Sequence, residues 1–379
     1  MLTRGYGVLC TDLRIEDRLK RFMEGGRDPE AAAVLAANNY TTQAQCSRIM
    51  EGDVVNVDIT APAAILALGL MYLRTNNTAV GEQLRIPDTH FLLDYVRPDF
   101  ILLRVLARNL VLWDDIVADE SWVLAHMPQM IAAALKEEGT ADDYEQDEDI
   151  DYEAVHHAHW NIIAAACLSL GLRFAGQADL EAQQVLLKYV AYFQDCARAG
   201  HSSRAGASKL DKPIMETCFD VVILALSLVM AGTGNLDTLR LFRTLRKRHS
   251  SELTYGNHMA IHMAIGFLFL GAGCCTLNNS NASIAALVAA LHPRFPLDTR
   301  DNRYHLQAFR HLYVLAVEPR CIEARDVDTN EPVYVPIKLT VSGAPRVNAD
   351  GAEESERISL KQVHAFANQH PDAMRAAQF

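Results

Sequence analysis

The chain has 379 residues and a formal net charge of −12; half of its residues are apolar and 22% are charged. This composition supports a large buried core and excludes global disorder. The acidic balance repels phosphate backbones, which argues against a nucleic-acid-binding protein.

The sequence also argues against a membrane protein and against a disulfide scaffold. The longest nearly uncharged stretch, 259–277, contains His262, ends in a glycine-rich turn and lacks an aromatic or basic belt. We therefore expect a buried core helix there rather than a membrane span. None of the eight cysteines forms a C-x-x-C pair, which favours free thiols in a reducing, intracellular compartment.

Residues 1–53 are predicted to form a partial repeat and a loop. From residue 54 onward one pattern recurs: an apolar helix of leucines and small residues, often with a glycine, followed by a short turn. The centres of these helices are Gly69, Asn109, Gly171, Ser227, Gly266 and His311. Two of the separations between centres are about 40 residues, the spacing of a two-helix solenoid repeat. We therefore predict that 54–320 is a stack of helical pairs.

The longer separations are explained by insertions between repeats. An acidic segment covers 137–153, a polar loop covers 200–213, and a proline-bearing connection covers 291–296. Insertions that fall between repeat cores are typical of stacked helical pairs.

Second helices are expected after the repeat centres, at 79–86, 181–193, 236–248 and 281–291. The stretch 221–231 is apolar on every face, so it must be surrounded by protein. Glycine inside a helix lets two backbones approach closely. The six centres should therefore lie in an inner layer covered by the second helices. A bulky side chain at Gly171 or Gly266 should prise neighbouring helices apart.

The C-terminal part changes character. Residues 321–341 have β-branched residues around a DTNEP turn, a pattern that predicts a β-hairpin. Residues 342–379 are polar and weakly patterned, and we expect a poorly ordered tail. The predicted fold is mainly α, a solenoid or toroid of helical-pair repeats with a small C-terminal β element.

Two long strings carry a family resemblance: VVNVDITAPAAILALGLMYLRTNNTAVGEQLRIPDTHFLLDYVRPDFILLRVLARNLVLWDDI at 54–116 and the segment 259–319, which includes HMAIGFLFLGAG. They resemble the C-terminal proteasome/cyclosome repeat region of the largest subunit of the anaphase-promoting complex. The resemblance covers roughly 1–341.

The resemblance implies a function. The complex is a multi-subunit ubiquitin ligase acting on mitotic regulators, and its largest subunit is a scaffold. Catalysis belongs to the cullin-like and RING subunits, whereas the repeats face the Doc-domain subunit and the coactivator. A scaffold subunit, or a fragment of one, in the nucleus and cytoplasm is therefore expected.

No catalytic, cofactor-binding or metal site is expected. His258 and His262 share a helix face but lack the glutamate and third ligand of a zinc site. The acidic segment 137–153 has no glycine at the position that the EF-hand pattern requires. A solvated loop and a docking site for a basic partner both remain open. Two other classes also remain open: a proteasome scaffold of the same repeat class, and an all-α enzyme, which would need a convergent polar cluster.

Overall fold

The computed structural model describes residues 13–26, 50–51, 54–93, 96–138, 150–199, 211–248, 253–298, 300–301, 304–320, 326, 328–329 and 331. The chain divides into two compact units, Met1–Glu318 and Pro319–Phe379. Nearly all of the described structure belongs to the first unit.

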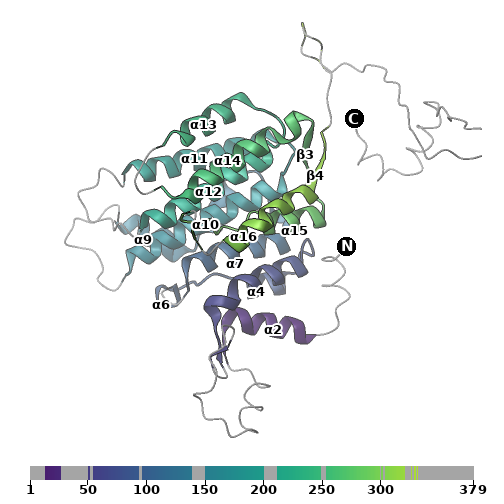
Figure 1. Cartoon of the computed structure of the whole chain (residues 1–379). Coiled ribbons are helices and arrows are strands. Elements are labelled where there is room, and N and C mark those ends of the chain that lie inside the picture. Colours follow the sequence, from purple (N-terminus) through teal and green to yellow (C-terminus); the bar gives the residue numbers. More distant parts are fainter. Residues whose placement is uncertain are drawn as a thin grey trace, which may run out of the picture. The chain divides into compact units, whose positions relative to one another are not determined.

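An inner row of helices organises the first unit (Figure 1). Its members are α4 (Val57–Met71), α7 (Pro98–Val111), α10 (Tyr152–Arg173), α12 (Asp211–Val229) and α14 (Tyr255–Leu268). Each of the first four packs against the next inner helix: α4 against α7, α7 against α10, α10 against α12 and α12 against α14.

The starts of the inner helices follow from local sequence chemistry. Asp151 caps α10 by accepting a hydrogen bond from the Ala154 amide, and Thr254 begins α14 with a reciprocal capping box through Asn257. Pro98 stands at the first helical position of α7, where a missing amide proton costs nothing.

A second layer covers the inner row, as the sequence predicts. One helix packs on each inner helix in turn: α2 (Leu13–Glu24) on α4, α5 (Thr78–Gln83) on α7, α9 (Gln129–Glu138) on α10, α11 (Leu180–Ala199) on α12 and α13 (Leu236–Arg246) on α14. Short helical turns complete the connections: α6 (His90–Leu93), η1 (Trp113–Asp115) and α8 (Glu120–Leu124).

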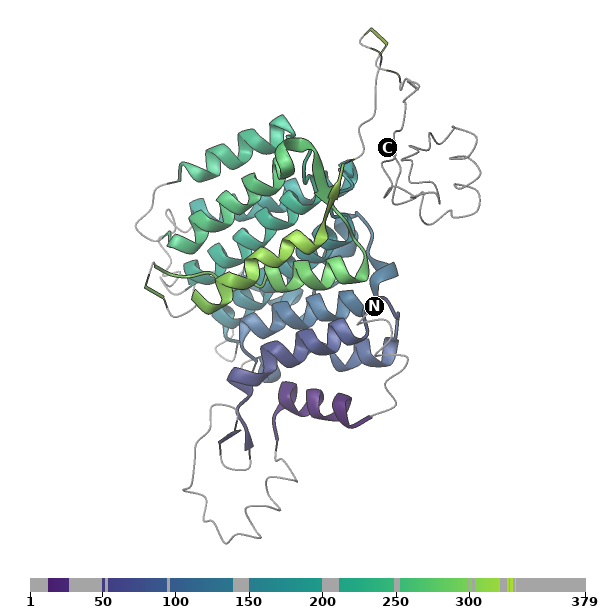
Figure 2. The same cartoon turned by 45° about the vertical axis from the view of Figure 1, so that its right-hand side comes forward.

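The residues after α14 leave this two-layer order. The chain passes through η2 (Leu270–Gly273), α15 (Asn281–Ala290), α16 (Tyr304–Gln307) and η3 (Ala308–Ala316). In Figure 2 the green ribbon of α15 and the lime ribbon of η3 lie side by side in front of the inner helices. η3 packs mainly against α15. The Arg74 guanidinium donates to the Asn279 carbonyl, and Arg294 pairs with Asp99, so this segment is held to α4 and α7.

The β structure is small. β1 (Met50–Glu51) and β2 (Val54–Val55) pair antiparallel, and β3 (Cys275–Leu277) and β4 (Val317–Pro319) form a second two-stranded sheet. The predicted hairpin at 321–341 lies mostly outside the described residues. Its turn is described: the Asp326 carboxylate accepts hydrogen bonds from the amides of Asp328 and Thr329. These bonds lower the pKa of Asp326. The predicted tail, 342–379, and most of the acidic segment, 139–149, also lie outside the description.

The core is continuous along the inner row. Every residue from Val221 to Ala231 is buried, including Ser227, which confirms that this all-apolar stretch is surrounded by protein. Among the described helices none is long and apolar enough to cross a bilayer.

Helix packing follows one rule at three interfaces. A Cβ atom on Gly69 would lie 2.8 Å from Ala107 Cβ, and one on Gly171 would lie 2.7 Å from Ala225 Cα. Asn109 Nδ2 donates to Ser169 Oγ at 3.1 Å. In each pair, a repeat-centre residue meets the residue two positions before the next repeat centre. The inner helices therefore approach at backbone distance, and glycine is required at two of these contacts.

Two expectations about the repeat centres need correction. Gly266 is exposed, and a Cβ atom there would meet no atom within 4 Å. A side chain at Gly266 therefore has no helix to displace. His311 is also exposed, and it lies in η3, which packs mainly on α15. The local sequence pattern predicts that both residues lie in repeats. Whether another inner helix packs against them depends on the tertiary structure, which a local pattern does not specify.

We predict opposite effects for one substitution at two glycines. Gly171→Leu should lower the free energy of unfolding by about 1–3 kcal/mol because the side chain collides with the backbone of α12. Gly266→Leu should leave it unchanged or raise it slightly, since leucine favours helix and the space is open. Urea unfolding followed by circular dichroism measures both. Equal destabilisation by the two variants would contradict the packing rule.

Candidate functional site: the open edge of the inner row

The turns that follow the inner helices have a repeated backbone geometry. Gly176 and Ala178 have φ values of 71° and 54°, and Gly232 and Gly234 have values of 73° and 59°. These left-handed residues direct their amides away from their own helix and toward its neighbour.

Backbone carbonyls at the C-terminus of the neighbouring inner helix accept hydrogen bonds from those amides. Gly176 and Ala178 donate to the carbonyls of Leu228 and Val229 in α12, at 2.9 and 3.0 Å. The turns after α4 and α12 make the equivalent pairs of bonds: Arg74 to Leu110, Asn76 to Val111, Gly232 to Phe267 and Gly234 to Leu268. Each turn thus satisfies carbonyls that the next helix leaves open at its end. The sequence shows the turn residues, but not that they bond to the following repeat.

The turn after α14 has no such neighbour in the described part of the chain. Gly271 and Gly273 have φ values of 57° and 86°, which matches the preceding turns. The hydrogen bonds described for this turn close on the turn itself, from Ala272 to the Phe269 carbonyl and from Cys274 to the Gly271 carbonyl. The turn therefore has the geometry to engage another helix end.

The face of α14 next to this turn is largely exposed. Tyr255, Met259, His262, Gly266 and Phe269 follow one another at intervals of four and three residues, so they lie on one side of the helix. Tyr255 is 52% and Phe269 is 42% exposed, and Gly266 lies flush between larger side chains. We call this stripe the open edge.

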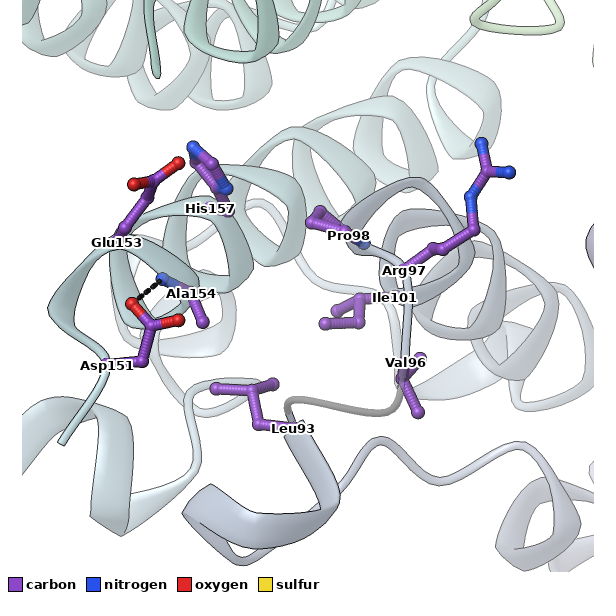
Figure 3. Close-up of a pocket in the computed structure, with 9 residues that line it drawn as sticks. All are labelled: Leu93, Val96, Arg97, Pro98, Ile101, Asp151, Glu153, Ala154 and His157. Carbon is purple, nitrogen blue, oxygen red and sulfur yellow. Dashed lines mark hydrogen bonds between the residues drawn. The ribbon is translucent and has the colours of Figure 1, made fainter. Parts of the chain in front are cut away.

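The N-terminal ends of α4, α7 and α10 carry acidic residues in the first helical turn: Asp58, Asp99 and Glu153. Asp151, Glu153 and His157 from α10 and Pro98 and Ile101 from α7 line a cavity of about 310 Å³ (Figure 3). The side chain of Arg97, which also lines it, points away from the two carboxylates. The bond from the Ala154 amide to Asp151 Oδ1 is 3.1 Å long. Asp151 is therefore used in capping the helix.

Catalytic chemistry finds little support among the described residues. No group of three or more His, Cys, Asp or Glu there could hold a metal ion. His262 is exposed and His258 is half-buried on α14. Burial raises the pKa of the Cys167 and Cys218 thiols, so neither is a thiolate at neutral pH.

The buried polar groups of the row are structural. His126 Nε2 lies 2.9 Å from Asn109 Oδ1, and Nδ1 lies 2.9 Å from the Trp122 carbonyl. Burial lowers the pKa of His126, with Arg108 contributing. Asn109 Nδ2 donates to Ser169 Oγ, and Asn109 Oδ1 accepts from His126 in the tautomer that carries the ring proton on Nε2.

This arrangement defines the class: a helical-repeat protein whose successive repeats pack on one another through inner helices and the turns that follow them. A family profile described as APC1 fifth domain matches residues 1–318. The chain belongs to the family of anaphase-promoting complex subunit 1. It is 45% identical to the proteins of that name from Mus musculus and Homo sapiens, over 96% of this chain and 18% of each relative.

More distant relatives agree. Identity is 42% to anaphase-promoting complex subunit 1 of Arabidopsis thaliana, over 90% of this chain and 20% of that protein. It is 41% to a negative regulator of mitosis from Emericella nidulans, over 76% of this chain and 13% of that protein. The chain therefore spans about a fifth or less of the length of these relatives, and the family resemblance seen in the sequence is confirmed.

Two buried histidines make the stability of the chain depend on pH. Burial lowers the pKa of His159 to about 4, with His156 contributing, and lowers that of His292 to about 4, with Arg310 and Arg294 contributing. His159 Nε2 lies 3.1 Å from the Tyr192 hydroxyl between α10 and α11. Both side chains are therefore neutral in the folded chain at pH 6.

We predict that the contribution of His159 and His292 to the free energy of unfolding falls as the pH decreases from about 6.5 to about 4. The unfolded chain binds protons at these histidines near pH 6.5 and the folded chain only near pH 4, so stability is complete above that window. Each histidine contributes at most about 3 kcal/mol. His159→Phe should flatten the slope in urea unfolding at stepped pH. An unchanged slope would show that His159 titrates normally.

Proposed function

We propose that the chain is a non-catalytic scaffold segment of the anaphase-promoting complex, and that its open edge receives an inner helix of a neighbouring repeat. The observation that carries the proposal is the contrast between three interfaces, where α4, α7, α10 and α12 meet at their repeat centres, and Gly266, where the space for a Cβ atom is open. A repeat helix with a small residue opposite Gly266 would continue the row and offer its C-terminal carbonyls to the turn after α14.

The occupant follows from the geometry of the row. Gly69 and Gly171 each receive an alanine of the next inner helix at backbone distance. Gly266 presents the same backbone surface, flanked by the exposed rings of Tyr255 and Phe269. Relatives about five times as long supply room for further repeats outside this chain. An isolated chain would expose the apolar stripe, which favours association.

The family supports the rest of the proposal. The resemblance implies cullin-like, RING and Doc-domain subunits and the coactivator as partners, with catalysis in the cullin-like and RING subunits. The relatives from Mus musculus and Homo sapiens are named as subunits of the anaphase-promoting complex. Assembly in the nucleus and cytoplasm, with no cofactor, no nucleic acid and no membrane partner, completes the proposal.

The test uses a tagged copy of the chain in its native cell. Recovery of the cullin-like and RING subunits by affinity purification is expected. Gly266→Leu should reduce that recovery at least tenfold, because the side chain holds a docking helix away from the open edge. The matched control is Ala63→Leu, at an exposed position of α4.

The two variants separate folding from assembly. Both should unfold at the temperature of the parent chain, since neither side chain enters the core. If Gly266→Leu recovers the subunits as well as the control does, the open edge is not a repeat interface. If the parent recovers none of them and turns over a small molecule, the scaffold assignment is wrong.

A further inference from the structure

A second cavity lies among the N-terminal ends of the inner helices. It has a volume of about 470 Å³ and is bounded by the starts of α4, α7, α12 and α14 and by the loop 293–297. Four carboxylates line it: Asp58, Asp99, Glu216 and Asp220. The family resemblance assigns nothing to it.

The loop that closes the cavity is firmly attached. The amides of Tyr255 and Gly256 donate to the carbonyls of Leu297 and Pro296, at 3.1 and 2.8 Å. Gly256 is required here because a Cβ atom would lie 2.5 Å from Phe295 Cβ. The cavity is therefore a preformed feature of the fold.

Three of the four carboxylates already have a cationic partner. Arg97 pairs with Asp58 at 3.3 Å and with Asp99 at 3.1 Å, and Arg294 pairs with Asp99 at 3.2 Å. Arg248 makes two bonds to Glu216, at 3.1 and 3.0 Å. These pairs balance three negative charges within the chain.

Asp220 is the exception. Its side chain is fully buried, and its Oδ2 accepts a bond of 2.7 Å from Asn257 Nδ2. No described residue bonds to its Oδ1, although Asp220 lines the cavity. A buried polar atom without a hydrogen-bond partner destabilises the folded chain, so a ligand that satisfies it is favoured. Burial raises the pKa of Asp220, and Glu216 adds to this while the Asn257 bond and Arg248 oppose it.

The rim of the cavity is apolar. Ile59 is 48% exposed and Leu297 is 54% exposed, and both line the cavity. A lysine or arginine side chain has the matching order of groups, an aliphatic stem that packs on apolar surface and a charged head that seeks an acceptor.

We propose that this cavity binds a basic side chain of a partner polypeptide, with Asp220 Oδ1 as the acceptor for its ammonium or guanidinium head. Such a head binds the ionised form of Asp220 and takes the place of the proton that burial favours on this carboxyl in the unbound chain. The stem lies between Ile59 and Leu297. The site is formed by this chain alone, so it does not depend on the occupant of the open edge.

The test measures binding of short peptides to the purified full chain. The probes are acetyl-Gly-Arg-Gly-amide and acetyl-Gly-Lys-Gly-amide, with their neutral citrulline and acetyl-lysine counterparts. Binding is followed by NMR through the side-chain amide of Asn257. At least one cationic peptide should bind at least ten times more tightly than its neutral counterpart.

Substitutions locate the acceptor. Asp220→Asn keeps the shape of the side chain and should weaken binding at least tenfold. Ile59→Lys, at an exposed rim position, should weaken it by repulsion without disturbing the fold. Asp237→Asn is the matched control for net charge because that side chain is 80% exposed on α13 and paired with Arg240, away from the cavity.

Each result decides the proposal. Loss of binding in Asp220→Asn and Ile59→Lys, with the Asp237→Asn control unchanged, supports it. Equal affinity for cationic and neutral peptides overturns it, as does unchanged affinity in Asp220→Asn. No change in the Asn257 signal with either cationic peptide also overturns it. None of these results bears on recovery of complex subunits, so failure here and failure of the proposed function are distinguishable.

Discussion

Backbone-distance packing between consecutive inner helices is the constraint on which the rest of the structure depends. At Gly69 and Gly171 there is no room for a Cβ atom, since Ala107 and Ala225 of the next helix already occupy it. Helices that approach so closely place each turn over the C-terminus of the following helix, where left-handed residues can reach its open carbonyls. Side-chain packing and backbone hydrogen bonding therefore reinforce one geometry.

A row built in this way has two kinds of binding surface. Its edge presents the same contact that its interior uses, so the exposed face of α14 is complementary to another helix of the same kind. Its N-terminal helix ends gather polar groups, because acidic residues are favourable near helix N-termini. The carboxylates around Asp220 and the open edge are thus consequences of stacking parallel inner helices.

The segment after α14 shows that the row does not extend itself within the described chain. η3 packs on α15, and hydrogen bonds on either side of α15 hold this segment to the row, from Arg74 to the Asn279 carbonyl and from Arg294 to Asp99. This placement leaves Gly266 uncovered. It also forms the roof of the cavity that contains Asp220, since the loop 293–297 belongs to the same segment.

The sequence by itself determined the helical pairs, the fully buried stretch around Ser227 and the family, because periodicity, capping residues and long specific strings are local properties. It also marked Gly171 as a site of close approach. Only the tertiary structure decided that Gly266 lies at an edge and that His311 is exposed on η3. It also decided that Asp220 accepts a hydrogen bond from Asn257 in a cavity where Arg248 and Arg294, far away in the sequence, pair with Glu216 and Asp99. These facts depend on which helix lies next to which. Local pattern cannot specify them, since an inner helix has the same sequence signature with or without a neighbour.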